Sequence, residues 1–317
     1  MTYGYNERLG IVAGIMLLLV FAAVLITVLS GISHQDEKRV QIVASFLPVY
    51  NAAIQVTDGV EGVEVKNLVP PQNGCLHDYQ LTPENVIALS KADALIINGA
   101  GAESFLGDLH SQYADLKVID TSEGIALLEG IHHHHHEDEE EEHEEIINEH
   151  IWTGPSNYIK QIENLRDQLI RLDPVHAHQY RANAENYIAE IETVKAELAE
   201  AASSLPTKNC IIFHDSLAYF ARELGFNILA SLSTGEESVL SASELAEAVK
   251  TAALADKILL IYDDQYHTEY ASVAQEASFS RTLRLNMAVA SSTQGTDDVW
   301  LDAMRANIQI LKDTDGD

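Results

Sequence analysis

Residues 175–204 read VHAHQYRANAENYIAEIETVKAELAEAASS, and this stretch decides how the chain is organised. Its apolar positions are spaced four and three residues apart, which places them along one side of an α-helix: Tyr180, Ala184, Tyr187, Ile191, Val194 and Leu198. At about 1.5 Å per residue the helix would be roughly 45 Å long, enough to run along two small domains. We therefore predict one long helix, which Pro206 ends, between two halves of the chain.

Both flanks of this helix alternate short apolar runs with helical segments. Strand candidates lie at 40–45, 63–69, 94–98, 117–120, 210–213, 226–231 and 257–262. Helix candidates lie at 48–57, 85–91, 156–172, 216–224, 243–255, 268–277 and 299–312. Strands that alternate with helices indicate mainly parallel sheets. The predicted fold class is α/β, with one lobe over 40–174, a linking helix over 175–205 and a second lobe over 206–317.

The N-terminal segment, residues 1–39, differs from the rest. Leu9–Leu29 is almost wholly apolar and uncharged, and about 20 such residues span a bilayer. We expect a single membrane anchor followed by a polar tether, with an unusually long cleavable signal peptide as the alternative. The protein would then lie on the extracytoplasmic face of the membrane, or be secreted or periplasmic after cleavage.

The charge of the chain limits the classes of molecule that it can bind. The chain has 49 Asp and Glu against 19 Lys and Arg, a formal net charge of −30. An acidic body repels phosphate backbones, so nucleic acid is excluded as a partner and a cation is favoured. Cys75 and Cys210 are too few for a Cys-rich zinc site, and they allow one disulfide or none.

Three histidines stand where an α/β sheet places ligands. His214 directly follows a predicted strand, and ligand sites form at the carboxyl ends of such strands. His77 precedes the helix that Thr82 opens, and His150 lies where regular structure resumes after an acidic segment. Neutral imidazoles suit Zn²⁺ first among the divalent ions, so we predict a metal site. Asp78 and Asp215 are candidates to orient the neighbouring imidazoles.

Four segments resemble the zinc/manganese solute-binding subunits of ABC transporters: GCLHDYQLTPENVIALSKADALIINGAGAESFL, EHIWTGPSN, FHDSLAYFARELGFN and STGEESVLSASELAEAV. The resemblance covers nearly all of the chain after the apolar segment, in the family's order. The resemblance implies two α/β lobes, a rigid connecting helix and one metal ion in the cleft between them. It places His77, His150 and His214 at three ligand positions. Because manganese-preferring members usually carry a carboxylate at the third, His214 favours zinc, with Mn²⁺ as the alternative cargo.

The fourth ligand departs from the family. The family's Asp near the C-terminus corresponds here to Asn286, and a neutral amide is a poor zinc ligand beside a carboxylate. Asp263 or Asp264, from the segment IYDDQY, or a water molecule is the alternative. The sequence therefore leaves open both the fourth ligand and the affinity of the site for zinc.

A His-rich acidic segment falls within residues 130–149, which we expect to be a disordered loop because like charges repel and little can be buried. Its imidazoles are candidates to collect metal ions near the cleft: His132, His133, His134, His135, His136 and His143. The alternative is a solvated insertion without function. Metal binding by this loop should weaken below about pH 6.5, because a protonated imidazole cannot bind a metal ion.

The sequence favours binding over catalysis. It contains no HExxH, GxSxG or phosphate-binding loop. The predicted function is an extracytoplasmic solute-binding subunit, a monomer, that captures Zn²⁺ and delivers it to an ABC permease in the membrane. The alternatives are a surface zinc-buffering or adhesion protein and, less favoured, a zinc hydrolase.

Overall fold

The structure is a computed structural model that describes residues 39–71, 79–107, 115–130, 147–232, 242–254, 256–266, 278–290 and 298–313, together with residues 16, 20–22, 76, 113 and 274. Met1–Arg39 and Val40–Asp317 form separate compact units. The expected anchor Leu9–Leu29 lies outside the described residues, apart from residues 16 and 20–22. Across the part of the chain that is described, no helix combines the length and the apolar character that crossing a membrane requires.

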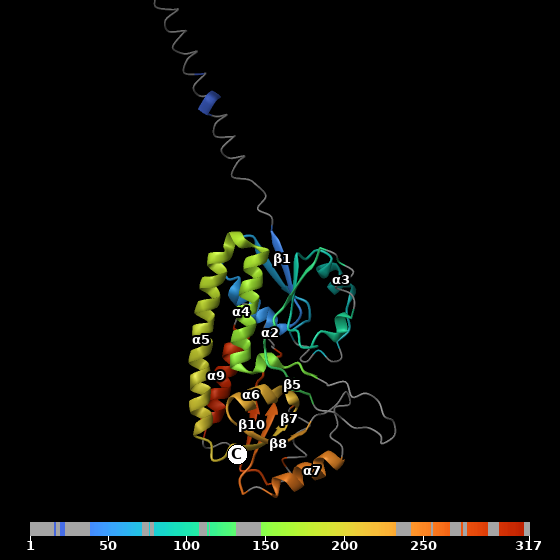
Figure 1. The fold of residues 1–317 in the computed structure, drawn as a ribbon, viewed down its shortest axis with the longest axis vertical. Helices are drawn as coiled ribbons and strands as arrows, with labels where there is room; N and C mark the ends of the chain where they lie inside the picture. The colour runs from blue at the N-terminus through green and yellow to red at the C-terminus, as the bar shows by residue number, and fades with distance from the viewer. Residues whose placement is uncertain are drawn as a thin grey trace, which may run out of the picture. The chain divides into compact units, whose positions relative to one another are not determined.

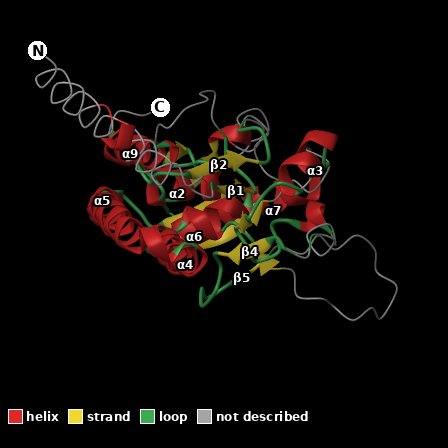
Figure 2. Ribbon diagram, turned by 90° about the horizontal axis from the view of Figure 1, so that it is seen from above, coloured by secondary structure: helices red, strands yellow, loops and turns green. Residues whose placement is uncertain are grey.

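Four parallel strands form the sheet of the first half, in the order β2-β1-β3-β4. They are β1 (Val40–Ala44), β2 (Val63–Asn67), β3 (Ala94–Ile97) and β4 (Lys117–Asp120). Alternate side chains of β1 enter different cores: Ile42 and Ala44 belong to the main core, and Val43 packs with Leu89 of helix α3 (Pro83–Leu89). Figure 2 shows the strands between α3 on one side and helices α4 (Pro155–Leu172) and α5 (Ala177–Ser203) on the other.

Thr82 starts α3 as the sequence predicts. Its hydroxyl oxygen accepts a hydrogen bond from the Asn85 backbone N–H at 3.3 Å, and Asn85 Oδ1 accepts the Thr82 N–H at 2.8 Å. This reciprocal pair is a capping box, and Pro83 occupies the first turn.

The second half repeats the parallel pattern in the order β10-β9-β7-β8. Its elements are β7 (Asn209–Phe213), α6 (Ala218–Glu223), β8 (Asn227–Leu232), α7 (Ala242–Ala252), β9 (Leu259–Asp263), β10 (Arg281–Leu285) and α9 (Val299–Lys312). Strand β10 was not predicted, although its RTLRL sequence alternates polar and apolar residues as a half-buried strand does. The helix expected over 268–277 lies outside the described residues, apart from Ala274. The predicted α/β fold with two parallel sheets is confirmed.

A short antiparallel hairpin, also missed, is hydrogen-bonded to Tyr219 of α6 in the second half. Strands β5 (Leu128–Glu129) and β6 (Ile147–Asn148) pair Leu128 with Asn148 and Glu129 with Ile147. The predicted disordered loop over 130–149 therefore ends earlier than expected, since residues 147–149 belong to this ordered segment. Two-residue strands are too short to leave a periodic signal, and the acids around them suggested solvent exposure.

The long helix α5 lies against both halves. All six residues of the predicted stripe are buried. The helix packs against α4 and α2 (Leu47–Val56) from the first half and against α9 from the second, and Figure 1 shows α4, α5 and α9 side by side. This contact with elements from both ends of the chain is what the stripe predicts for a linking helix.

A buried polar cluster ties these helices together. Asn51 Nδ2 of α2 donates to Tyr158 Oη of α4 at 3.2 Å and to Tyr187 Oη of α5 at 2.8 Å. The Tyr187 hydroxyl donates to Asp298 Oδ1 at 2.9 Å, and Asp298 caps α9. Buried hydrogen-bonded groups fix the relative positions of four helices more specifically than apolar packing does.

The protein's two tryptophans lie in the core between the halves. Trp152 is 2% exposed and its indole N–H donates to the Met287 carbonyl at 2.9 Å. Trp300 is fully buried and donates to the Trp152 carbonyl, also at 2.9 Å. The core is therefore continuous from the first sheet through this pair to α9.

Candidate metal centre

His150 lies two residues after the end of β6, at the start of the short helix η3 (Ile151–Thr153). It is 1% exposed, and its ring lies 5.2 Å from the Trp152 ring between centroids. The Thr153 hydroxyl donates to the His150 carbonyl at 2.9 Å. On the first-half side, Asn98 at the end of β3 donates its amide N–H to the Glu149 carbonyl at 2.9 Å. The backbone that carries this imidazole is thus held from several directions.

His214 directly follows β7, at the carboxyl end of a central strand as predicted. Its backbone has a φ of 83° and a ψ of 137°, a conformation that residues with a Cβ rarely adopt. The His214 N–H donates to the Leu232 carbonyl of the adjacent strand at 2.6 Å. The Ser216 N–H donates to His214 Nδ1 at 3.1 Å, so this ring nitrogen is an acceptor.

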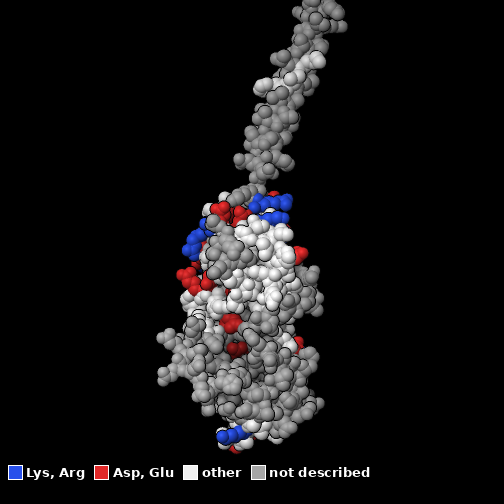
Figure 3. Space-filling view, turned by 90° about the vertical axis from the view of Figure 1, so that its right-hand side faces the viewer, with Lys and Arg blue, Asp and Glu red and all other residues white. Residues whose placement is uncertain are grey.

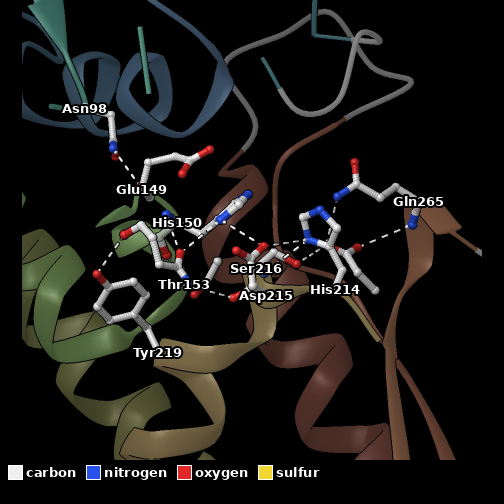
Figure 4. Close-up of polar contacts among 11 residues, drawn as sticks. Asn98, Glu149, His150, Thr153, His214, Asp215, Ser216, Tyr219 and Gln265 are labelled. Carbon is white, nitrogen blue, oxygen red and sulfur yellow. Dashed lines mark hydrogen bonds and ion pairs between the residues drawn. The ribbon is translucent and has the colours of Figure 1, made fainter. Parts of the chain in front are cut away.

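The structure brings His150 and His214 together with Asp215 (Figure 4). The two imidazole centroids are 5.2 Å apart, with the rings at 84°. Asp215 Oδ1 lies 3.6 Å from His150 Nδ1 and 3.4 Å from His214 Nδ1. One ligand atom from each residue lies within 4.8 Å of the others. Ligand atoms around a tetrahedral zinc ion are about 3.3 Å apart, so the three side chains lie near the spacing that one ion requires.

Asp215 belongs to this cluster as a ligand candidate, whereas the sequence analysis expected it only to orient an imidazole. Its place directly after His214 was the available signal. Among the described residues, these three are the group close enough to share an ion.

The residues that the sequence offered as a fourth ligand each make other polar contacts. Asn286 Oδ1 accepts the Ala288 N–H at 2.8 Å, which uses the amide oxygen in a local turn. Asp264 forms an ion pair with Arg284. Asp263 is 1% exposed and accepts hydrogen bonds from the Ser216 hydroxyl at 3.2 Å and the Gln265 amide at 3.0 Å. Burial raises the pKa of Asp263 to about 7.

Several predicted site residues lie outside the described residues: His77, His132–His136 and His143. Asp78 also lies outside the described residues, whereas Leu76 and Tyr79 on either side of this pair are described. Leu76 is buried in the main core, and the Tyr79 hydroxyl donates to Asn85 Oδ1 of α3 at 2.8 Å. The contribution of His77 and of the histidines in the acidic segment to metal binding stays a prediction.

Cys210 is a buried thiol with no disulfide, and burial raises its pKa to about 12. Cys75 lies outside the described residues. Of the two alternatives for Cys210, a disulfide or a free thiol, the structure has the free thiol.

Acidic side chains are visible near the middle of one face in Figure 3, and the Lys and Arg side chains drawn there appear toward its two ends. The formal net charge of −30 adds a long-range attraction for cations.

Asn148 was missed altogether. It is 1% exposed, and its side-chain oxygen lies 3.0 Å from His150 Nδ1. The only signal in the sequence was that Asn148 lies two residues before a proposed ligand. An asparagine at such a position does not by itself indicate a role in the site.

Two parallel α/β halves joined by one long helix, with a His–His–Asp cluster where the halves meet, define a metal-binding solute-binding protein. The family model described as "Zinc-uptake complex component A periplasmic" (ZnuA) matches residues 42–314. The chain belongs to this family, which confirms the resemblance found in the sequence.

Relatives agree with the family assignment. The high-affinity zinc uptake system protein ZnuA of Bacillus subtilis is 26% identical over 298 residues, which cover 90% of each chain. The manganese-binding lipoprotein MntA of Halalkalibacterium halodurans is 27% identical over 153 residues, 48% of this chain and 47% of MntA. A crystal structure of ZnuA superposes with a TM-score of 0.68 at 27% identity, covering 86% of this chain and 98% of that one.

Proposed function

We propose that this protein is the extracytoplasmic solute-binding subunit of an ABC transporter, which captures Zn²⁺ and delivers it to a membrane permease. The observation that carries the proposal is the convergence of His150, His214 and Asp215. The site lies in a chain whose family is described by zinc uptake. The cluster matches the donor types that zinc prefers, imidazole nitrogen and carboxylate oxygen. The family is one of binding proteins, which supports binding rather than turnover.

The ligand set we propose is His77, His150, His214 and Asp215. The last three supply two imidazoles and one carboxylate from a compact cluster. His77, on the segment before α3, would supply the third imidazole. Asp215 is favoured as the carboxylate ligand over Asp263 and Asp264, because those two are engaged with Ser216, Gln265 and Arg284.

Zinc is favoured over Mn²⁺ as the cargo. Imidazole-rich sites suit zinc, whereas carboxylate, carbonyl and water ligands suit manganese. A relative named for manganese binding makes Mn²⁺ the competitor to include in every titration.

The experiment that tests the site is a competition titration of metal-free protein with Zn²⁺ or Mn²⁺ against a coloured chelator. We expect His77→Ala, His150→Ala, His214→Ala and Asp215→Ala each to weaken zinc binding. The loss should exceed the 10- to 100-fold that removal of an outer partner typically causes. His178→Ala removes an exposed imidazole and is the matched control. If His150→Ala and His214→Ala bind zinc as tightly as the parent, the site is wrong.

Cellular uptake tests the transport role. Deleting the gene should abolish growth in zinc-depleted medium, and the parent gene should restore it while His214→Ala does not. Unchanged ⁶⁵Zn uptake in the deletion strain would contradict delivery to a permease, even if the purified protein binds zinc.

A further inference from the structure

Asn148 contacts both segments that carry the imidazoles. Its Oδ1 accepts the His150 backbone N–H at 3.0 Å and lies 3.0 Å from His150 Nδ1. Its Nδ2 donates to the Asp215 carbonyl at 2.9 Å. Its own carbonyl accepts the Tyr219 hydroxyl of α6 at 2.8 Å. One buried side chain therefore joins the loop after β6 to the loop after β7.

Two backbone groups determine which way the Asn148 amide faces. A backbone N–H can only donate, so the atom facing the His150 N–H is the amide oxygen. A carbonyl can only accept, so the atom facing Asp215 O is the amide nitrogen. The reversed amide would place two donors together at one end and two acceptors at the other.

This orientation constrains the His150 ring. An amide oxygen accepts only, so the 3.0 Å contact is a hydrogen bond when Nδ1 carries the proton. In a neutral ring the lone pair is then on Nε2, and that nitrogen can accept a metal ion. We propose that Asn148 is a positioning residue that presets His150 in the metal-accepting tautomer and ties it to the His214–Asp215 segment. The inference rests on the proposed zinc site.

His214 has the opposite arrangement. Its Nδ1 accepts the Ser216 N–H, so a neutral His214 ring carries its proton on Nε2. Binding a metal ion through Nε2 requires this ring to give up the Ser216 hydrogen bond and turn. Metal binding through Nε2 therefore requires a change of tautomer at His214 and none at His150.

Nitrogen NMR of the metal-free full chain tests the tautomers directly. At about pH 8, where an ordinary imidazole is neutral, ¹⁵N–¹H correlation spectra distinguish a protonated Nδ1 from a protonated Nε2. We expect opposite tautomers for the two rings, Nδ1–H for His150 and Nε2–H for His214. His150→Gln and His214→Gln assign the signals. A His150 ring with its proton on Nε2 would overturn the proposal without any variant of Asn148.

Variants of Asn148 test the consequence for binding. Asn148→Leu removes both polar ends at similar volume and should lower zinc affinity about 10- to 100-fold, with the His150 signal shifted toward Nε2–H. Asn148→Asp keeps an acceptor toward His150 and should retain the Nδ1–H signal. Asn227→Leu changes an exposed asparagine of β8 and is the control.

The outcomes separate this inference from the proposed function. If His150→Ala weakens zinc binding and a folded Asn148→Leu protein binds zinc like the parent, the site stands and the positioning role is wrong. If neither substitution matters, the site itself is wrong. A structural role alone would lower the thermal midpoint of Asn148→Leu and leave the tautomer of His150 unchanged, which would also contradict the proposal.

Discussion

The backbone of His214, with its φ of 83°, is held where a side chain with a Cβ is unfavourable. The Leu232 carbonyl and the Ser216 N–H fix the backbone and the ring on either side of this strained residue. Strain of this kind persists when the surroundings determine the conformation, and it is common at binding sites.

Two substitutions at His214 should separate strain from metal binding. Both His214→Gly and His214→Ala remove the imidazole and should lose zinc affinity equally. The metal-free glycine variant should be more stable than the alanine variant by about 1–3 kcal/mol, because only the alanine retains a Cβ in this conformation. Urea denaturation of the two proteins measures the difference. An alanine variant as stable as the glycine variant would show that the site relaxes.

For single residues, the sequence predicted which histidines belong to the site better than it predicted which neighbouring side chains contact them. His150 and His214 were predicted because strand ends and the loops beside them are where α/β sheets place ligands. Asp215 and Asn148 were not found as ligand and positioning residue, because an acid or amide beside a histidine is usually exposed to solvent. Their roles depend on side-chain directions that only the fold defines.

Helix α5 was predicted at the element scale to within a few residues. The 4-3-4-3-4 spacing left no competing interpretation, and prolines mark both ends. Strands β5 and β6 were missed because each has only two residues. Strand β10 was missed although its alternating polarity is typical of a half-buried strand.

Truncating two adjacent residues of α5 should change the free energy of unfolding by very different amounts. Ile191 is fully buried within the stripe, and Ile191→Ala should lower the free energy of unfolding by about 2–5 kcal/mol. Glu192 is exposed on the other side of the helix, and Glu192→Ala should change it by less than about 0.5 kcal/mol. Chemical denaturation checks both. Equal effects would mean that the buried stripe is not what holds the helix.

The whole molecule combines a cation site with a long insertion between β5 and β6. The paired residues Glu129 and Ile147 hold the two ends of this insertion side by side. Sequence patterns predicted both halves and the helix between them, since each rests on local periodicity. How β5 and β6 approach each other could not be predicted, because that pairing joins residues across the His-rich segment.

Deleting residues 132–146 should remove metal ions of low affinity and keep the principal site. The deletion can be closed by a short turn because β5 and β6 already pair. We expect equilibrium dialysis to show fewer zinc ions per chain, with the tightest dissociation constant unchanged. The lost ions should also be the ones released from the parent below about pH 6.5. Loss of the tightest binding instead would place essential ligands in the loop.

The paired burial of Trp152 and Trp300 gives the protein an intrinsic optical probe. Both indoles are hydrogen-bonded within the core, and one of them lies 5.2 Å from the His150 ring between centroids. Emission excited at the red edge of protein absorption comes only from these two residues, and a charged ion arriving beside His150 changes the electric field across the Trp152 indole. Occupancy can therefore be followed by the wavelength and yield of native luminescence, with no dye attached.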